Sequence, residues 1–168
     1  PMFNLINGGA HSDNGLTMQE FMATPVMDGS NFASKMEAGV KIFNKLKSIL
    51  KKINKSTSVG DEGGFAPKLN SNEEAIEILV EAIMESGYKP REDIVIAVDV
   101  AANYIPDLTT ITYPKNPVDY YQQLVNDYPI EMLEDPFHDS ESGLWQQLTS
   151  LIGSRVAIVG DDLFSPNI

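Results

Sequence analysis

The sequence predicts an α/β fold built on a parallel sheet, and the second half of the chain carries the main evidence. Three short apolar segments, residues 94–100, 130–133 and 156–159, are separated by two segments with helical spacing of apolar residues. An alternation of strand and helix joins parallel strands through right-handed crossovers. The sheet is therefore either doubly wound or closed into a barrel. No Gly-x-Gly-x-x-Gly follows a strand, so the fingerprint of a dinucleotide-binding fold is missing.

The composition indicates one soluble domain. The chain has 168 residues, of which 42% are hydrophobic and 21% charged, and no low-complexity linker divides it. Its net charge of -12 disfavours binding to nucleic acid or to an anionic membrane, and favours cations or cationic partners. The absence of cysteine excludes a disulfide framework and fits an intracellular, cytoplasmic setting. No apolar run approaches the roughly 18 to 20 residues that span a bilayer.

The first elements are two extended segments and a long helix. Residues 2–6 have strand character and lead into Asn7-Gly8-Gly9, and residues 20–26 form the second extended segment. A helix is predicted over 32–54, with many lysines on its solvated face. Its apolar face is expected to contain Phe32, Met36, Val40, Phe43 and Leu50.

Local signals also mark the elements that follow. Residues 71–74, Ser-Asn-Glu-Glu, are typical of a capping box at the start of a helix that stops at Gly87. The segment 94–100 is apolar except for Asp99, as expected of a strand buried on both faces. After an irregular stretch over 103–116, Asn116-Pro117 starts a helix. The inward side chains of this helix are expected to be Tyr120, Tyr121, Leu124 and Val125.

Each of the three predicted parallel strands terminates in an acidic residue, Asp99, Glu134 or Asp161. Because parallel strands place their carboxyl ends at one edge, these side chains should lie close together and repel unless a cation compensates. With oxygen ligands alone, Mg²⁺ is the expected cation, and Mn²⁺ and Ca²⁺ are alternatives. One such aspartate often only caps a helix, but three at equivalent places favour a metal site. Asp135 and Asp162, the second members of acidic pairs, are expected to support the site or to cap helices.

The first half of the chain adds a histidine and two more carboxylates. His11 follows a Gly-Gly turn after the first strand and should reach the same edge, where an imidazole can donate to an anionic ligand. Glu20 begins the second extended segment, and Glu62 lies in the loop S-V-G-D-E-G-G-F-A-P at 58–67. If these two carboxyl groups share a site, their pKa values split, and one stays protonated near neutral pH as a general acid.

Six short motifs are spread over almost the whole chain. They are N-G-G-A-H-S-D-N (7–14), Q-E-F-M (19–22), V-G-D-E-G-G-F-A-P (59–67), D-V-A-A (99–102), E-D-P-F (134–137) and V-G-D-D-L (159–163). In order and content together they resemble enolase, the glycolytic lyase that dehydrates 2-phosphoglycerate to phosphoenolpyruvate.

The resemblance implies roles for the acidic residues. Asp99, Glu134 and Asp161 correspond to the ligands of the tightly held Mg²⁺. The residues expected to bind the substrate are His11, Glu20, Glu134 and Asp161. Glu62 corresponds to the catalytic residue that donates a proton to the departing hydroxyl, with Glu20 paired to it and Asp61 in support.

The resemblance also implies a fold: a partial TIM-like α/β barrel of the enolase type, in which the second strand is antiparallel to its neighbours. Residues 1–168 would then be the first part of the enolase C-terminal barrel domain. The N-terminal α+β domain, the last barrel units and the catalytic base, a lysine, are expected in a longer parent protein. The parent is expected to be a homodimer, and the 168-residue chain alone is expected to be inactive.

Two alternatives stay open on the sequence. Another member of the wider superfamily, such as an acid-sugar dehydratase or a mandelate-racemase-like enzyme, would also use three carboxylates at strand ends, but lacks the Gly-Gly-x-His and Asp-Glu-Gly-Gly-Phe-Ala-Pro segments. A non-catalytic enolase-like protein would act as a structural or surface-binding partner. The activity of the parent protein would distinguish this second alternative from an enzyme.

Overall fold

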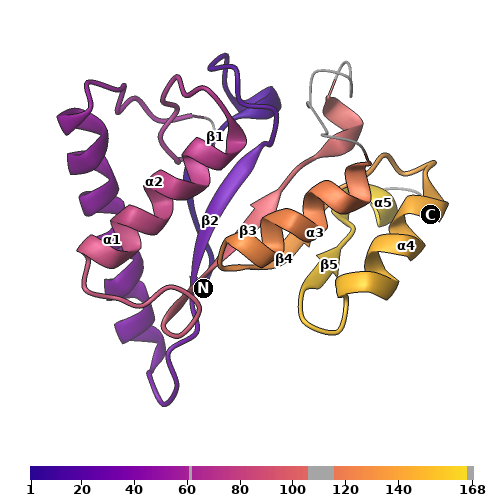
Figure 1. Ribbon diagram of the computed structural model, residues 1–168. Helices are drawn as coiled ribbons and strands as arrows, with labels where there is room; N and C mark the ends of the chain where they lie inside the picture. Colours follow the sequence, from indigo (N-terminus) through magenta and orange to yellow (C-terminus); the bar gives the residue numbers. More distant parts are fainter. Residues whose placement is uncertain (61, 106–115, 166–168) are drawn as a thin grey trace.

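The computed structural model describes residues 1–60, 62–105 and 116–165, and its centre is one five-stranded mixed sheet (Figure 1). The strands lie side by side in chain order: β1 (Phe3–Asn7), β2 (Glu20–Pro25), β3 (Ile94–Asp99), β4 (Ile130–Glu134) and β5 (Ala157–Val159). β2 is antiparallel to both β1 and β3, whereas β3, β4 and β5 are parallel. The predicted α/β fold and the antiparallel second strand are confirmed. The sheet is not closed, since β1 and β5 are its edges.

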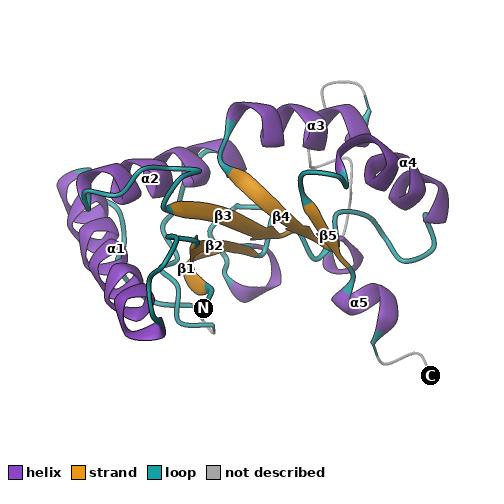
Figure 2. Ribbon diagram, turned by 90° about the horizontal axis from the view of Figure 1, so that it is seen from below, coloured by secondary structure: helices purple, strands orange, loops and turns teal. Residues whose placement is uncertain are grey.

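Four helices form an arc around one side of this sheet (Figure 2). They are α1 (Phe32–Lys52), α2 (Asn72–Glu85), α3 (Pro117–Asp127) and α4 (Ser142–Ile152). Three shorter elements follow strands: η1 (Gly9–His11), η2 (Ala102–Tyr104) and α5 (Asp161–Phe164). Among the described residues, no helix is both long and apolar enough to cross a membrane.

The helix boundaries follow the predicted caps. At the start of α2, the Ser71 hydroxyl accepts the Glu74 N–H at 3.2 Å. The reciprocal half of the expected capping box is shifted by one residue, because the Glu74 carboxylate accepts from the Asn70 N–H at 2.6 Å. Asn116 caps α3 by accepting the Val118 N–H at 2.9 Å. Gly87 has a φ of 84°, the left-handed conformation that ends helices.

The core confirms most of the expected inward positions. All six residues of β3 are buried, in agreement with a strand covered on both faces. The four inward side chains expected in α3 are buried as well: Tyr120, Tyr121, Leu124 and Val125. Of the irregular stretch predicted over 103–116, residues 106–115 lie outside the described residues.

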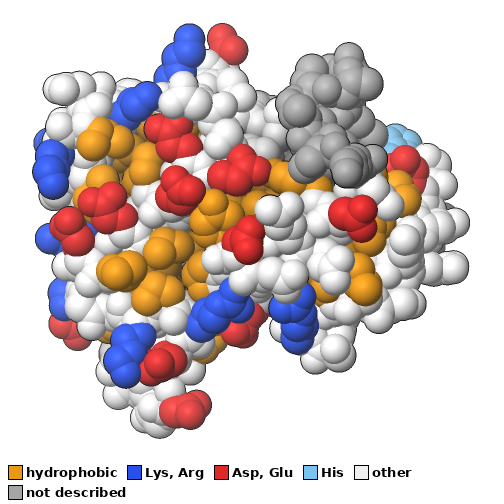
Figure 3. All heavy atoms as spheres, viewed as in Figure 1, with side chains coloured by type: hydrophobic (Ala, Val, Ile, Leu, Met, Phe, Trp, Pro, Cys, Tyr) orange, Lys and Arg blue, Asp and Glu red, His pale blue; other side chains and the backbone are white. Residues whose placement is uncertain are grey.

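The expected apolar face of α1 is wrong in part. Phe32 and Val40 are 68% and 53% exposed, whereas the buried face includes the small residues Ala38 and Gly39. The reason is a close approach to β1: a Cβ on Gly39 would lie 2.3 Å from the ring of Phe3. Small side chains therefore fix which face of α1 packs inward. The seven lysines between residues 35 and 55 are exposed or half-buried, as predicted, and basic side chains line the left edge of Figure 3, where α1 lies.

Candidate functional site

Three carboxylates form a row across neighbouring strands at one end of the sheet. Glu20 in β2 is the register partner of Asp99 in β3, and Asp99 is the register partner of Glu134 in β4. Because β2 is antiparallel, its first residue lies at the carboxyl end of β3. In the next strand, Val159 pairs with Glu134, so that Asp161 follows β5 at the same end. The sheet register thus brings together the acids that the sequence predicted to converge.

A cavity of about 460 Å³ lies at this end of the sheet. Its lining includes every residue for which a catalytic, substrate-binding or metal-binding role was predicted: His11, Glu20, Glu62, Asp99, Glu134 and Asp161. Ala10, Gln19, Tyr104 and Asp162 complete the lining. The structure therefore places the predicted residues around one cavity, and their individual roles stay predictions.

Burial and mutual repulsion raise the pKa values of the carboxyl groups in this row. Asp99 is 9% exposed, and its pKa is raised to about 8, first by burial and then by the charges of Glu134 and Glu20. The Ala101 N–H, which donates to Asp99 at 2.9 Å, acts in the opposite direction. The pKa of Glu134 is also raised, by burial and by neighbouring acids, chiefly Asp135 and Asp161. The row is short of positive charge.

Asp135 lies closer to the row than the sequence indicated. Oxygen atoms of Asp99, Glu134 and Asp135 all lie within 4.8 Å of one another, whereas Asp161 is exposed and lines the cavity outside this compact group. Asp135 also caps α5, because its Oδ2 accepts the Asp162 N–H at 2.9 Å. It therefore has the expected capping role and, in addition, a place beside the two central carboxylates.

Two side chains from the loops of the first half, His11 and Glu62, form a second group with Glu20 at the end of the row. Suitable atoms of His11, Glu20 and Glu62 lie within 4.8 Å of one another, and His11 Nδ1 is 3.6 Å from Glu20 Oε1. The pKa of Glu20 is raised by burial and by the charge of Glu62, while His11 lowers it. Two carboxyl groups with an imidazole beside them can share and transfer a proton. Asp61, expected to support Glu62, lies outside the described residues.

The sequence reasoning missed two polar residues of the cavity, Gln19 and Tyr104. The Gln19 amide donates to Asp99 Oδ2 at 3.3 Å, and Tyr104 belongs to η2, directly after the strand that carries Asp99. A signal for Gln19 was available, because it stands next to Glu20 in the motif Q-E-F-M. Tyr104 lies in the stretch predicted only as irregular, and no pattern there pointed to the cavity.

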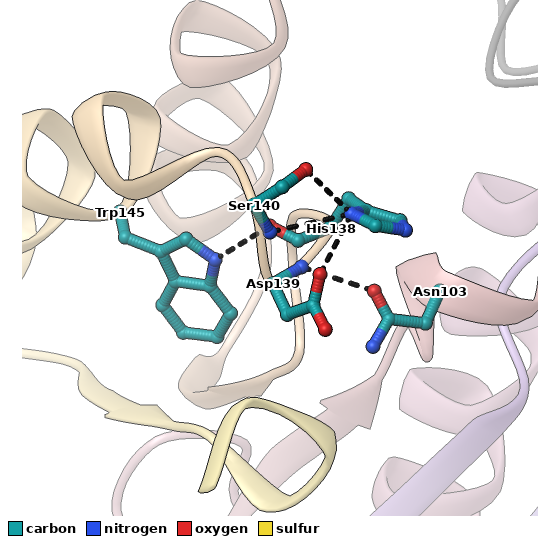
Figure 4. A network of polar contacts seen from close by, with 5 residues as sticks. All are labelled: Asn103, His138, Asp139, Ser140 and Trp145. Atoms are coloured by element: carbon teal, nitrogen blue, oxygen red, sulfur yellow. Dashed lines mark hydrogen bonds and ion pairs between the residues drawn. The ribbon is translucent and has the colours of Figure 1, made fainter. Parts of the chain in front are cut away.

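The loop after β4 is fixed by a polar network of its own (Figure 4). His138 Nδ1 contacts both Asp139 Oδ1 at 2.9 Å and Ser140 Oγ at 2.8 Å. The Asp139 N–H donates to Asn103 of η2 at 3.0 Å, and the Trp145 indole donates to the His138 carbonyl at 3.1 Å. In a catalytic triad the serine and the acid contact opposite ring nitrogens, which they do not do here. The network instead connects the segments that follow β3 and β4, and so supports the ends of both strands.

The candidate ligand atoms fit a hard divalent cation. Every candidate ligand in the row is a carboxylate oxygen, the type that Mg²⁺ and Ca²⁺ prefer. Oδ1 of Asp135 is buried and has no hydrogen-bond partner among the described residues. Buried carboxylates with raised pKa values and an unpaired acceptor are stabilised by a cation placed between them.

The sheet is open and combines parallel strands with one antiparallel strand, and an acidic cavity lies at the strand ends. These features are those of a part of an α/β barrel whose candidate site is built from carboxylates. A family comparison agrees with this class: the family described as "Enolase, C-terminal TIM barrel domain" matches residues 1–168. The chain belongs to the enolase C-terminal TIM barrel domain family. This membership indicates a lyase of the enolase superfamily and agrees with the resemblance seen in the six motifs.

Proposed function

We propose that this chain is part of an enolase that reversibly dehydrates 2-phosphoglycerate to phosphoenolpyruvate with Mg²⁺. The main support for the proposal is the row of carboxylates formed by the register partners Glu20, Asp99 and Glu134. His11 and Glu62 line the same cavity as this row. We further propose that the activity belongs to a protein with a complete barrel, which forms a homodimer in the cytoplasm and needs neither nucleic acid nor membrane.

The carboxylates would provide the metal site. Asp99, Glu134 and Asp161 would hold Mg²⁺, with Asp135 beside them. When bound, Mg²⁺ supplies positive charge that stabilises the negative charge developing on the substrate carboxylate. Glu134 and Asp161 would also lie against the substrate, which gives the acids at the end of β4 and after β5 a second role.

The second group would handle the leaving hydroxyl. Glu62 would donate the proton that lets the hydroxyl depart as water, and Glu20, whose pKa is raised by burial and by the charge of Glu62, would share that proton with it. His11, 3.6 Å from Glu20, would donate to the anionic substrate. The groups that abstract the substrate proton are proposed to come from the rest of the complete barrel.

The direct test is formation of phosphoenolpyruvate from 2-phosphoglycerate by the complete protein, followed by ultraviolet absorbance. Glu62→Gln should lower kcat by about 100-fold or more, because it removes the proton donor. Glu131→Gln is the matched control, since Glu131 is an exposed carboxylate on β4 and lies outside the cavity lining. Activity toward an acid sugar in place of 2-phosphoglycerate, or full activity of Glu62→Gln, would refute the proposal.

A further inference from the structure

The two loops that carry His11 and Glu62 need contacts beyond the pairing of β2, β3 and β4 to fix them relative to each other. His11 lies in the connection between β1 and β2, and Glu62 lies in the segment that follows α1. The pairings of β2, β3 and β4 set the positions of Glu20, Asp99 and Glu134, but they include neither loop. The separation between His11 and Glu62 must therefore depend on contacts of the loops with β1 and with each other.

Asn14 provides such a contact. Its side-chain amide donates to the Asn7 carbonyl at the end of β1 at 2.8 Å, and to the Pro67 carbonyl at the end of the Glu62 segment at 3.0 Å. Its Oδ1 accepts the Leu16 N–H at 3.2 Å, within the His11 connection. Asn14 is only 4% exposed. Both N–H groups and the oxygen of one buried amide are thus used to connect three segments.

The backbone beside Asn14 shows which parts it holds together. Phe65 pairs with β1: its N–H donates to the Leu5 carbonyl at 2.8 Å, and its carbonyl accepts the Asn7 N–H at 2.8 Å. Gly60 donates to the Gly64 carbonyl at 2.7 Å and closes the turn that contains Glu62. The turn is therefore anchored on its far side by Phe65 and Pro67, and the Pro67 anchor is made by Asn14.

We propose that Asn14 is a positioning residue that sets the distance between Glu62 and the His11 side of the cavity. The inference rests on the proposed function, because it assigns Asn14 to the step in which Glu62 donates its proton. Asn14 lies outside the lining of the cavity and acts only through the two loops. Its loss should therefore misplace the acid and leave the proposed metal ligands Asp99, Glu134 and Asp161 in place.

Asn72 offers a matched control. It is also buried, and its side chain also makes three hydrogen bonds to the connection between β1 and β2, with the Thr17 N–H, the Met18 N–H and the Thr17 hydroxyl. These bonds tie the connection to the start of α2 and not to the Glu62 segment. Asn72→Ala thus removes as many hydrogen bonds as Asn14→Ala without touching the proposed link.

The first test uses amide hydrogen exchange in the 168-residue chain and needs no activity. In Asn14→Ala, exchange of the Asn7 and Phe65 amides should become about tenfold faster, while the Ile96 amide, which pairs β3 with the residue before β4, should be unchanged. In Asn72→Ala the Asn7 and Phe65 amides should keep their wild-type rates. Unchanged rates in Asn14→Ala would overturn the proposed link.

The second test measures kcat and KM of the complete protein. Asn14→Ala should lower kcat about 10- to 100-fold with KM within about twofold of wild type, because a displaced catalytic group costs rate more than binding. Asn72→Ala should lower kcat much less. Equal losses in both variants would show general destabilisation and overturn the positioning role.

Two further outcomes have defined meanings. If the wild-type complete protein forms no phosphoenolpyruvate, the proposed function fails, and hydrogen exchange alone decides whether Asn14 links the loops. If circular dichroism shows that Asn14→Ala is unfolded, Asn14→Ser, which keeps one donor, replaces it. The serine variant should then show the same pattern with a smaller loss of kcat, and a wild-type kcat would overturn the proposal.

Discussion

Glu20 and Asp99 are register partners across β2 and β3, although one begins its strand and the other ends it. The antiparallel direction of β2 makes this possible, because its first residue lies beside the last residue of β3. A parallel second strand would place Glu20 at the opposite end of the sheet. The single antiparallel strand therefore adds a carboxylate to the row and makes the cavity more acidic.

Magnesium binding should depend on the row of carboxylates. Isothermal titration of Mg²⁺ into the chain should give saturable binding, weakened by about tenfold or more in Glu134→Gln because a ligand oxygen loses its charge. Glu131→Gln, on the same strand but exposed, should bind Mg²⁺ like wild type. Circular dichroism should show the same helix content in all three proteins. Equal affinity in the Glu134 and Glu131 variants would argue against a metal site at the strand ends.

In the absence of divalent cations, the free energy of unfolding should fall as pH rises from about 4 to about 8. The folded chain holds the Asp99 proton up to a pKa of about 8, whereas an unfolded aspartate releases it near its ordinary value of 3.8. The folded state thus binds more protons in this window, and deprotonation favours unfolding. Urea midpoints measured across the window should decrease, and Asp99→Asn should flatten the decrease. An unchanged slope in Asp99→Asn would assign the effect to other groups.

Gly64→Ala should destabilise the chain. A Cβ at this position would lie 2.7 Å from Asn7 Oδ1 and 3.0 Å from the Leu5 carbonyl carbon, so β1 and the Glu62 segment would have to separate, at a cost of roughly 1–3 kcal/mol. Gly143→Ala in α4 is the control: nothing lies within 4 Å of its Cβ position, and the free energy of unfolding should rise by about 0.5–1 kcal/mol. Chemical denaturation measures both. Equal stability of the two variants would mean that the Gly64 position can relax.

The purified 168-residue chain should form no measurable phosphoenolpyruvate, even where the complete protein does. In the proposed function the residues of the cavity supply a proton donor and a metal site, whereas the base that abstracts the substrate proton comes from another part of the complete barrel. The assay described for the complete protein serves here, with that protein as positive control. Measurable turnover by the pure chain would refute the assignment of the base to another part of the barrel.

Strand ends were the most predictable part of the site. Asp99, Glu134 and Asp161 follow or end apolar runs, and the parallel order of the strands determines that they line one cavity. Asp135 could not be placed in the same way, because it reaches the row through a left-handed backbone conformation with a φ of 41°. Such a conformation is uncommon for a non-glycine residue and leaves no pattern in the sequence.

The buried face of α1 and the position of the loop around Glu62 could not be predicted from the sequence either. Large apolar residues pointed to Phe32 and Val40, whereas the contact with β1 is made where Gly39 lets the ring of Phe3 approach. The Glu62 loop was recognised by its motif, but its place depends on Phe65 pairing with β1 and on Asn14. Both arrangements depend on tertiary contacts, which periodicity and spacing do not report.

The pairing of Glu20 with Asp99 joins residues 79 positions apart (99 minus 20), with α1 and α2 between them. Closing so long a segment costs chain entropy that is recovered only when β2 and β3 align, so this contact is expected to form late in folding. The complete carboxylate row cannot exist before that event. Capture of a divalent cation during refolding would therefore report the final alignment of the sheet, and the refolding rate should be the same with or without the cation.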